Sequence, residues 1–87
     1  MKDNWYLISY LFRSQNRQKV LQALKRNPKT PKQLDELTNI RINHISNILK
    51  ELLEKELVKC LNPSDKKGRF YEITEMGLEI LNFLENT

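Results

Sequence analysis

The sequence predicts a small, mainly helical domain that carries one β-hairpin, and three observations support this prediction. Apolar residues recur at helical spacing in successive segments between residues 15 and 56. Two short apolar segments, 57–61 and 69–73, flank a polar, turn-rich stretch. A further apolar helical segment covers residues 75–85. With 87 residues, the chain is expected to form one domain around one modest hydrophobic core.

The first two segments differ in how clearly they are defined. Residues 5–12 are apolar and aromatic, and their pattern leaves open a short helix or an extended arm. Residues 15–26 are predicted to form a helix after Ser14, which is a good N-cap. This helix ends before Pro28, because the residue preceding a proline avoids the helical region. Its predicted buried stripe consists of Val20, Leu21 and Leu24.

Two helices joined by a short turn are predicted next. Thr30 and Pro31 begin the first helix, because proline is favoured in a first turn. Asn39 is expected to adopt a left-handed backbone at its end. Asn43 is expected to cap the second helix, which runs to about residue 55 or 56. The residues expected to face the core are Leu34 and Leu37 of the first helix, Ile40 of the turn, and Ile45, Ile48, Leu49 and Leu52 of the second helix.

A hairpin and a last helix complete the chain. Residues 57–61 are predicted to form a strand, and residues 69–73 are predicted to return beside it. Thr74 is expected to cap a final helix from residue 75 to about residue 85, with acids in its first turn.

This order of elements is that of a winged helix-turn-helix domain, with a three-helix core, a two-stranded wing and a C-terminal helix. We expect residues 1–87 to form a single domain. Within it, residues 1–13 form an N-terminal arm or helix, residues 14–74 the winged helix core and residues 75–87 the C-terminal helix. Such a domain places a polar helix face beside a basic hairpin, which suits a DNA groove and its backbone.

Charge is distributed unevenly along the chain, whose formal net charge is +4. No acidic residue occurs from Asn4 to Leu34, and no basic residue occurs after Arg69. A surface with uneven charge is the simplest explanation of this pattern. The pattern also allows one part of the molecule to face a polyanion while the other part does not.

The second helix of the helix-turn-helix is the predicted reader of DNA. An α-helix fits the major groove, and asparagine, histidine, serine and lysine side chains form hydrogen bonds with base edges. Near its start this helix carries Arg41, Asn43 and His44. We assign base contacts to His44, Ser46 and Asn47, and contacts with phosphate or guanine to Arg41 and Lys50.

Two further segments are candidates for contact with the DNA backbone. The wing carries Lys66, Lys67 and Arg69, which are expected to lie along the phosphates or to place Arg69 in a narrow minor groove. Thr30 and Lys32 surround the backbone amides at the start of a helix, where a phosphate is favoured. An ordinary helix cap at Thr30 is the alternative for this position.

Other chemistry is nearly excluded by the composition. One histidine and one cysteine do not make a Cys/His metal site within a single chain. We find no nucleophile-base pair, so we expect no enzymatic activity, no cofactor and no small-molecule ligand. Cys60 has no partner for an internal disulfide, which suits a reducing cytoplasm. No apolar run is long enough to span a membrane.

The last helix is apolar on more than one side. Its apolar residues are Met76, Leu78, Ile80, Leu81, Phe83 and Leu84. A helix on one small domain needs a single apolar stripe, so the surplus surface requires another partner. We expect a homodimer formed by this helix and the N-terminal segment, since most soluble oligomers are closed homodimers. Packing against the N-terminal segment of the same chain is the alternative.

Three stretches resemble the ArsR/MarR-like winged helix transcription regulators, especially their small archaeal members. Residues 14–24, SQNRQKVLQAL, resemble the first helix of these regulators. Residues 45–58, ISNILKELLEKELV, resemble their recognition helix and its exit into the strand. Residues 68–77, GRFYEITEMG, resemble their wing strand and the entry to the last helix. The resemblance extends over about residues 14 to 84.

The resemblance implies a set of DNA contacts that agrees with the residue-by-residue assignment. The implied contacts are Asn43, His44, Ser46, Asn47 and Lys50 on the recognition helix and Arg69 on the wing. Glu56 stands where these regulators usually have glycine, so the helix exit is expected to differ. The cysteine-rich motif of metal-sensing members is absent, so metal sensing is not implied.

These observations together predict a cytoplasmic, homodimeric repressor that binds double-stranded DNA and blocks transcription. The alternative is a winged helix that serves as a protein-interaction module in a transcription or replication assembly. Polar residues on the recognition helix, such as Asn47 and Lys50, favour DNA. Large exposed apolar residues would favour a protein partner, and an exposed Leu53 would be one of these.

Overall fold

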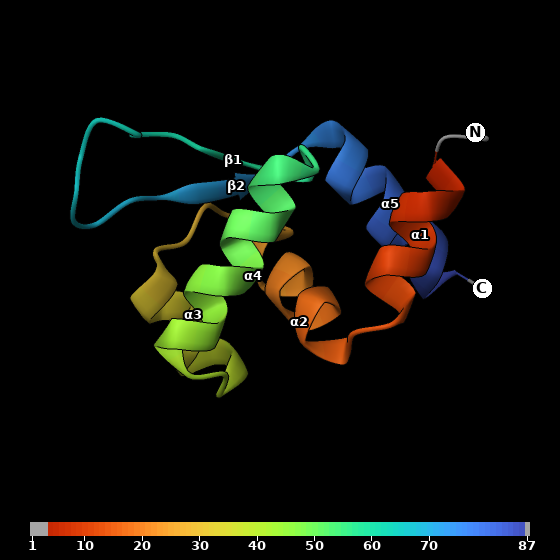
Figure 1. Ribbon diagram of the computed structural model, residues 1–87, viewed down its shortest axis with the longest axis horizontal. Coiled ribbons are helices and arrows are strands. Elements are labelled where there is room, and N and C mark those ends of the chain that lie inside the picture. Colours follow the sequence, from red (N-terminus) through yellow and green to blue (C-terminus); the bar gives the residue numbers. More distant parts are fainter. Residues whose placement is uncertain (1–3, 87) are drawn as a thin grey trace.

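The computed structural model describes residues 4–86, which form five helices and two strands (Figure 1). The helices are α1 (Asn4–Phe12), α2 (Gln15–Leu24), α3 (Pro31–Thr38), α4 (Ile42–Glu54) and α5 (Glu75–Glu85), and the strands are β1 (Val58–Cys60) and β2 (Tyr71–Ile73). The mainly helical fold with a two-stranded wing and a C-terminal helix is confirmed. The N-terminal segment is a helix rather than an extended arm over its described part, and residues 1–3 and 87 lie outside the described range.

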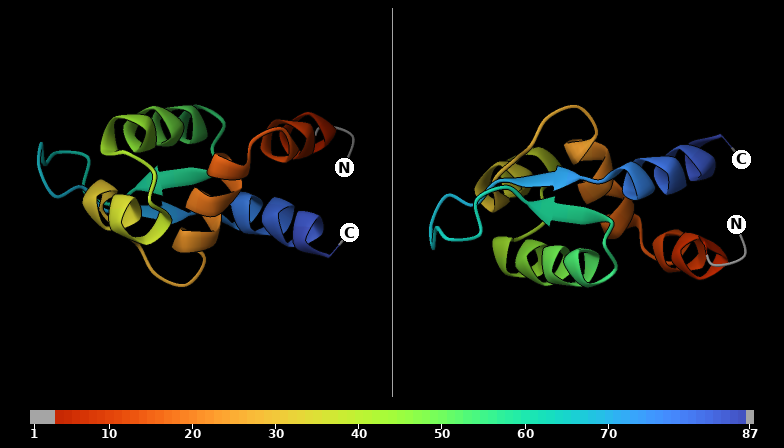
Figure 2. Two further views of the ribbon diagram at one scale, coloured as in Figure 1. Left: turned by 90° about the horizontal axis from the view of Figure 1, so that it is seen from below. Right: turned by 90° about the horizontal axis from the view of Figure 1, so that it is seen from above.

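The molecule has two distinct ends. Helices α3 and α4 and the wing lie at one end, while α1 and α5 pack side by side at the other (Figure 1). Both views in Figure 2 show the wing extending away from the body, opposite the two chain termini. Helix α2 contacts α1, α3, α4 and α5, so it joins the two ends.

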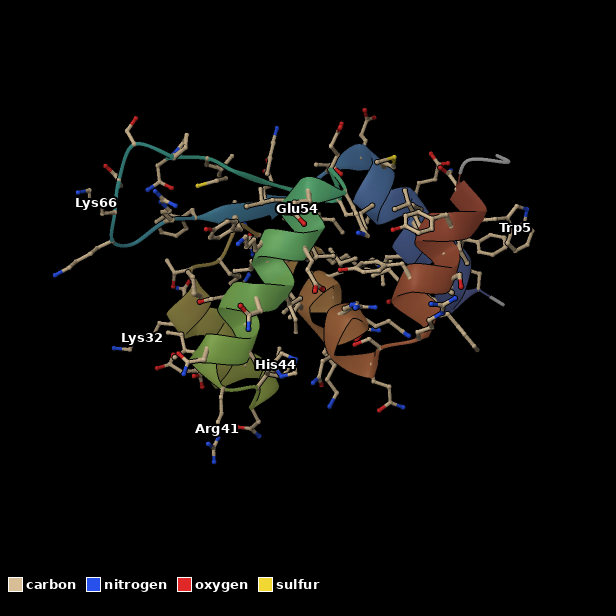
Figure 3. The ribbon with its side chains drawn as sticks, viewed as in Figure 1. Trp5, Lys32, Arg41, His44, Glu54 and Lys66 are labelled. Carbon is tan, nitrogen blue, oxygen red and sulfur yellow. The ribbon has the colours of Figure 1, made fainter. Side chains whose placement is uncertain are left out.

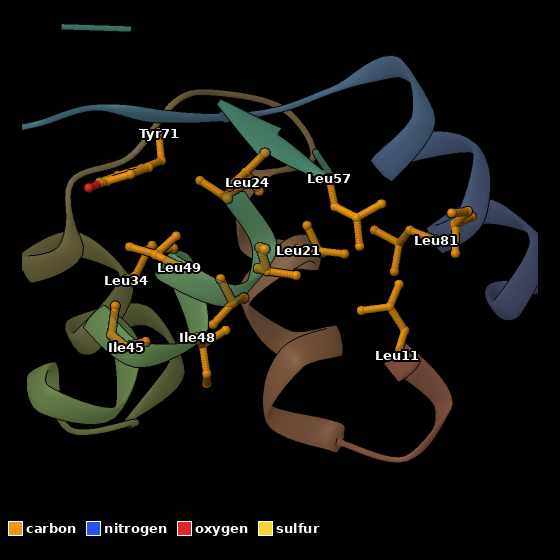
Figure 4. Close-up of a cluster of buried hydrophobic side chains, with 14 of the residues drawn as sticks. Leu11, Leu21, Leu24, Leu34, Ile45, Ile48, Leu49, Leu57, Tyr71 and Leu81 are labelled. Carbon is orange, nitrogen blue, oxygen red and sulfur yellow. The ribbon is translucent and has the colours of Figure 1, made fainter. Parts of the chain in front are cut away.

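One hydrophobic core runs between these ends (Figure 4). Leu11 of α1 and Leu81 of α5 are fully buried at one side of it. Leu21, Leu34 and Leu49 bring α2, α3 and α4 together at the other side. Each fully buried leucine contributes roughly 1.5–3 kcal/mol of hydrophobic stabilisation. The terminal helices therefore share the core of the helix-turn-helix.

Three predicted helix starts are confirmed by side-chain caps. The Oγ of Ser14 accepts a hydrogen bond from the backbone N–H of Arg17, and the Oγ1 of Thr74 accepts one from Gly77. Thr30 and Gln33 form a reciprocal capping box at the start of α3. Each cap satisfies backbone N–H groups that have no partner inside the helix. Asn39 has the predicted left-handed backbone, with φ of 61°.

Two predictions about the helix-turn-helix are wrong. Asn43 is not the cap of α4, because the helix begins at Ile42 and Arg41 occupies the N-cap position without a side-chain hydrogen bond. Leu37 does not face inward, since 61% of its surface is exposed. Ile40, in the turn, is buried and belongs to the core at the end of α3, so Ile40 takes the core position expected for Leu37.

The hairpin is shorter than predicted. The predicted strand residues Leu57, Leu61, Arg69 and Phe70 lie outside β1 and β2, whose last bridged pair is Cys60 with Tyr71. One backbone bond follows this pair, from the N–H of Leu61 to the carbonyl of Phe70 over 2.9 Å. The ladder ends because the side chain of Asn62 accepts the hydrogen bond of the Phe70 N–H. At its other edge, β2 pairs with Lys29, whose backbone N–H and C=O both bond to Tyr71.

Candidate nucleic-acid interface

The buried stripe of α4 determines which of its side chains reach the surface. Ile45, Ile48, Leu49 and Leu52 all lie in the core, as predicted. Because an α-helix turns once every 3.6 residues, the opposite face of α4 is directed outward. The predicted DNA-reading residues on this outward face are all exposed, namely Asn43, His44, Ser46, Asn47 and Lys50.

The structure brings three separate segments to one end of the molecule (Figure 3). Lys32 lies near the start of α3, Arg41 and His44 lie at the start of α4, and Lys66 lies on the wing. All four of these side chains are exposed. Trp5 lies at the far end of the molecule in the same view. The basic residues Lys32, Arg41 and Lys66 therefore lie on the side away from the terminal helices.

The start of α3 is fully explained as a helix cap. The backbone N–H of Gln33 donates to the Oγ1 of Thr30 over 3.2 Å, and the backbone N–H of Thr30 donates to the Oε1 of Gln33 over 2.9 Å. These two bonds satisfy the groups that the capping box normally satisfies. Lys32 is exposed beside them. A phosphate contact at Thr30 and Lys32 stays a prediction.

The wing presents its cations in two different ways. Lys66 and Lys67 are exposed at the tip. Arg69 is half-buried, and its guanidinium donates hydrogen bonds to the backbone carbonyls of Asp65 and Pro63 within the same loop. Gly68 has φ of +65°, a left-handed conformation that glycine adopts without strain. The two lysines and the arginine, grouped by the sequence, therefore have different surroundings.

A cluster around Tyr10 connects α1 with the C-terminal half of α4. The Oη of Tyr10 donates to the Oε1 of Glu51 over 2.8 Å. The Arg17 guanidinium carbon lies 3.8 Å from the centre of the Tyr10 ring, and the Lys55 Nζ lies 4.5 Å from it. Burial, and then the hydrogen bond to Glu51, raise the pKa of Tyr10 above its ordinary value.

This cluster changes the electrostatics of α4. By its spacing, Glu51 shares the polar face of α4 with Asn47, but the structure directs it toward Tyr10 and Arg17, whose Nη2 lies 3.4 Å from its Oε1. Glu54, the other acid of α4, lies at the end of the helix away from His44 (Figure 3). The acidic residues of α4 are therefore kept from the half of the helix that carries Asn43 and Asn47. Helical periodicity alone carries no signal for the Tyr10–Glu51 contact, which joins residues 41 positions apart.

The opposite end of the molecule exposes aromatic rings. On α1, Trp5 is 63% exposed and Phe12 is 73% exposed, and Tyr6 is also exposed. Phe83 of α5 makes an edge-to-face contact with Trp5 of the same chain. Part of the surplus apolar surface of α5, including Ile80 and Leu81, is buried within the chain, so the intrachain alternative is true for that part. The rings of Trp5, Tyr6 and Phe12 remain on the surface.

Two classes of site are not found in residues 4–86. Within this range, no three histidine, cysteine, aspartate or glutamate side chains are placed to hold a metal ion. Cys60 is half-buried beside the core and its thiol faces the Oδ1 of Asn62. Among the described helices, none has the length and apolar character that crossing a membrane requires.

Comparison with known proteins gives matches in structure. No family model matches the chain, and no curated protein matches it in sequence. The crystal structure of wild-type MarR from E. coli, in its apo form, matches with a TM-score of 0.76 and 26% identity, over 98% of this chain and 67% of that protein. A MarR/EmrR family regulator from Acinetobacter sp. ADP1 matches with a TM-score of 0.73 and 19% identity, over 84% of this chain.

A third match is a homodimeric winged helix-turn-helix DNA-binding domain from Mycobacterium bovis, a possible ArsR-family regulator. Its TM-score is 0.74 at 15% identity, with 97% of this chain and 77% of that domain covered. This chain spans only 53% of the Acinetobacter regulator, or about half its length. All three matches are transcription regulators or domains of them, a class of proteins that are not enzymes. The chain has the winged helix-turn-helix fold of the MarR-family and ArsR-family transcription regulators.

Proposed function

We propose that this protein is a transcription regulator that binds specific double-stranded DNA sequences as a homodimeric repressor. The observation that carries the proposal is the gathering of the exposed α4 face, the start of α3 and the basic wing at one end of the molecule. The acid-rich α5 lies at the other end, so a polyanion meets a favourable field on one side only.

The exposed face of α4 suits the major groove of DNA. This groove is about 12 Å wide and admits an α-helix, whose polar side chains then reach the base edges. His44, Ser46 and Asn47 are the proposed base contacts, while Asn43, Arg41 and Lys50 contact bases or the adjacent phosphates. Thr30 and Lys32 hold the phosphate backbone on one side of the groove. The lysines of the wing lie on the backbone or at the minor groove on the other side.

The aromatic rings of α1 support a homodimer. Trp5, Tyr6 and Phe12 are exposed, and Trp5 contacts Phe83 of α5. Apolar rings in water are unfavourable, and packing against a second copy of this chain would remove them from water. A two-fold dimer would bring two α4 helices to half-sites about 34–36 Å apart on a pseudo-palindrome. Such a dimer, in a reducing cytoplasm that keeps Cys60 free, represses by occupying DNA that the polymerase needs.

The test is a fluorescence anisotropy titration at several salt concentrations. The probes are DNA from upstream of the protein's own gene and a shuffled duplex of the same composition. We expect tight, salt-dependent binding with preference for the upstream DNA, because each phosphate contact releases counterions. The absence of binding to either duplex at low salt would contradict the proposal.

A matched pair of lysine variants locates the binding surface. Lys66→Ala removes a charge from the wing tip, and we expect the salt slope to fall by about one. The double variant Lys66→Ala with Lys67→Ala is expected to lower the slope by about two. Lys25→Ala removes the same charge from the other end, where Lys25 pairs with Glu85, and is expected to leave the slope unchanged. Equal effects of Lys66→Ala and Lys25→Ala would place the DNA elsewhere.

A protein-interaction module is the second candidate function. The exposed aromatic rings of α1 favour it, since they also suit an apolar partner protein. The face of α4 does not favour it, because its exposed residues are polar apart from Ile42 at the start of the helix, and Leu53 packs partly against the core. Binding of neither duplex, together with a monomer in solution, would support this second function.

A further inference from the structure

The wing loop is held in shape from inside by Asn62. Its Nδ2 donates to the Oδ2 of Asp65 over 2.9 Å and to the backbone carbonyl of Gly68 over 3.1 Å. Its Oδ1 accepts a hydrogen bond from the backbone N–H of Phe70 over 2.7 Å. One side chain at the start of the loop is therefore bonded to the middle and to the end of the loop.

Arg69 closes the same loop from its other end. Its Nε donates to the backbone carbonyl of Asp65, and its Nη2 donates to the backbone carbonyl of Pro63 over 3.1 Å. A guanidinium presents several donors in a rigid fork and so reaches two carbonyls at once, whereas a lysine ammonium is a single point of charge on a flexible stem. The role of Arg69 in this structure depends on that fork and not only on its charge.

These bonds leave the tip of the loop free to meet a ligand. Lys66 and Lys67 lie between the residues that Asn62 and Arg69 hold, and both are exposed. The left-handed backbone of Gly68 turns the chain back toward Arg69 directly after the two lysines. The loop is therefore fixed at its base by hydrogen bonds and carries two exposed cations at its tip.

We propose that Asn62 and Arg69 are positioning residues that hold Lys66 and Lys67 in place for the DNA backbone, and that Arg69 acts within the loop instead of on DNA. This inference rests on the proposed function. A loop that is already ordered loses less conformational entropy on binding than a mobile one, so the two braces strengthen binding without contacting DNA. The inference gives Arg69 a role different from the minor-groove contact predicted from the sequence.

The first test compares Arg69→Lys and Arg69→Ala in the full chain. Both variants lose the two-carbonyl brace, but only Arg69→Ala loses the charge. We expect both to weaken duplex binding by a similar factor, roughly three- to tenfold, because the cost lies in ordering the loop. The salt slope is expected to stay that of the wild type in both. A wild-type affinity for Arg69→Lys, with a slope reduced by about one for Arg69→Ala, would overturn the inference.

The second test measures the loop without DNA. Amide hydrogen exchange at Phe70 reports directly on the bond to Asn62, and we expect it to accelerate in Asn62→Ala. Arg69→Lys is expected to accelerate exchange in the same loop while exchange in α4 stays unchanged. Unchanged exchange in both variants would overturn the bracing role, whatever their affinity for DNA.

A double-mutant cycle links the brace to the lysines. If Arg69 acts by presenting Lys66 and Lys67, then Arg69→Lys costs nothing more once both lysines are alanine. An undiminished loss in that background would overturn this step. The failure of the proposed function has a separate signature, because the wild-type protein would then bind no duplex at low salt. If the wild type binds and the variants behave like it, the inference fails and the proposed function stands.

Discussion

The wing end and the terminal-helix end of the molecule are stabilised in different ways and expose different chemistry. At the wing end, side chains such as Asn62 bond to the backbone, and the exposed groups include the cations Lys66 and Lys67 as well as apolar side chains such as Leu37. At the terminal-helix end, Leu11 and Leu81 are fully buried while aromatic rings such as Trp5 remain exposed. Exposed polar and charged groups are stable in water and can exchange that water for a polyanion. Exposed apolar rings are more stable when they pack against another apolar surface.

Affinity and stability are therefore separable in this small domain. Changes at the wing end are expected to alter DNA binding with little effect on the free energy of unfolding. Changes at the terminal-helix end are expected to alter unfolding or assembly with little effect on base contacts.

Gly77→Ala is expected to destabilise the terminal-helix end strongly. A Cβ built on Gly77 of α5 would lie 2.3 Å from the backbone oxygen of Leu57 and 3.0 Å from the Cγ1 of Ile73. A backbone atom cannot move aside as a flexible side chain does, so α5 must shift from the start of β1. We expect the free energy of unfolding in urea to fall by about 3 kcal/mol.

The matched control for this prediction is the glycine of the wing. Gly68 has open space where a Cβ would lie, but its φ of +65° disfavours alanine. Gly68→Ala is expected to lower the free energy of unfolding by only about 1 kcal/mol. Equal losses in the two variants would show that the close contact with Leu57 at Gly77 costs no more than the left-handed strain at Gly68.

Asn47→Ala tests the other side of the comparison. Asn47 is exposed on the outward face of α4, so its removal is expected to leave the free energy of unfolding nearly unchanged. Loss of a hydrogen-bonded base contact is expected to weaken binding to the preferred DNA by about 2 kcal/mol and binding to shuffled DNA very little. Anisotropy titration with both duplexes measures this difference. An equal loss on both duplexes would make Asn47 a backbone contact.

Tyr10→Phe is expected to have a smaller effect, because it removes one hydrogen bond between the two ends. The hydroxyl of Tyr10 bonds to Glu51 of α4, and its loss is expected to cost about 1 kcal/mol in the free energy of unfolding. The ring stays between Arg17 and Lys55 in this variant. Urea unfolding at neutral pH measures the difference, and no change would show that Glu51 is held by Arg17 alone.

The stability difference between the wild type and Tyr10→Phe is expected to depend on pH. Burial and the bond to Glu51 raise the pKa of Tyr10 in the folded state above the ordinary tyrosine value of about 10. The folded protein therefore holds this proton more tightly than the unfolded chain does. The stabilisation by Tyr10 is complete below about pH 10 and falls as the pH rises above it. The advantage of the wild type over Tyr10→Phe is expected to shrink in that range.

The features that the sequence predicted correctly depend on nearby residues. The caps at Ser14, Thr30 and Thr74 each bond to a backbone group three residues away, so the local sequence contains both partners. The buried stripe of α4 was also predictable, because its four apolar residues follow the helical period without interruption.

The features that were missed depend on residues distant in sequence or on the shape of a loop. Leu37 fits the helical period of α3, but Ile40 belongs to the core at that end of the helix. Glu51 fits the polar face of α4, but its carboxylate contacts Tyr10 of α1 and Arg17 of α2. The hydrogen bond from Arg69 to the carbonyl of Pro63 was not predicted either, because it depends on the folded shape of the loop, while the DNA contact of Arg69 stays a prediction. None of these partners has a fixed spacing that a sequence pattern contains.

Glu56 lies at the junction of α4 with β1 and carries the smallest prediction. It follows α4 and precedes β1, and its φ of 60° lies in the left-handed region that glycine favours. The sequence comparison with winged helix regulators led us to expect a different helix exit, because they usually have glycine there. The structure retains the left-handed conformation and imposes it on a glutamate, whose Cβ makes it less favourable.

Glu56→Gly is therefore expected to stabilise the protein, although glycine usually weakens a fold. Relief of the left-handed strain exceeds the extra entropy that glycine adds to the unfolded chain, and we expect a net gain of about 0.5 kcal/mol in the free energy of unfolding. The bond from Thr74 Oγ1 to the carbonyl of residue 56 uses the backbone alone and is kept. DNA affinity is expected to stay unchanged, since residue 56 follows the C-terminal end of α4, whereas the proposed DNA contacts begin at its start. A loss of stability would show that the Glu56 side chain contributes more than its backbone strain costs.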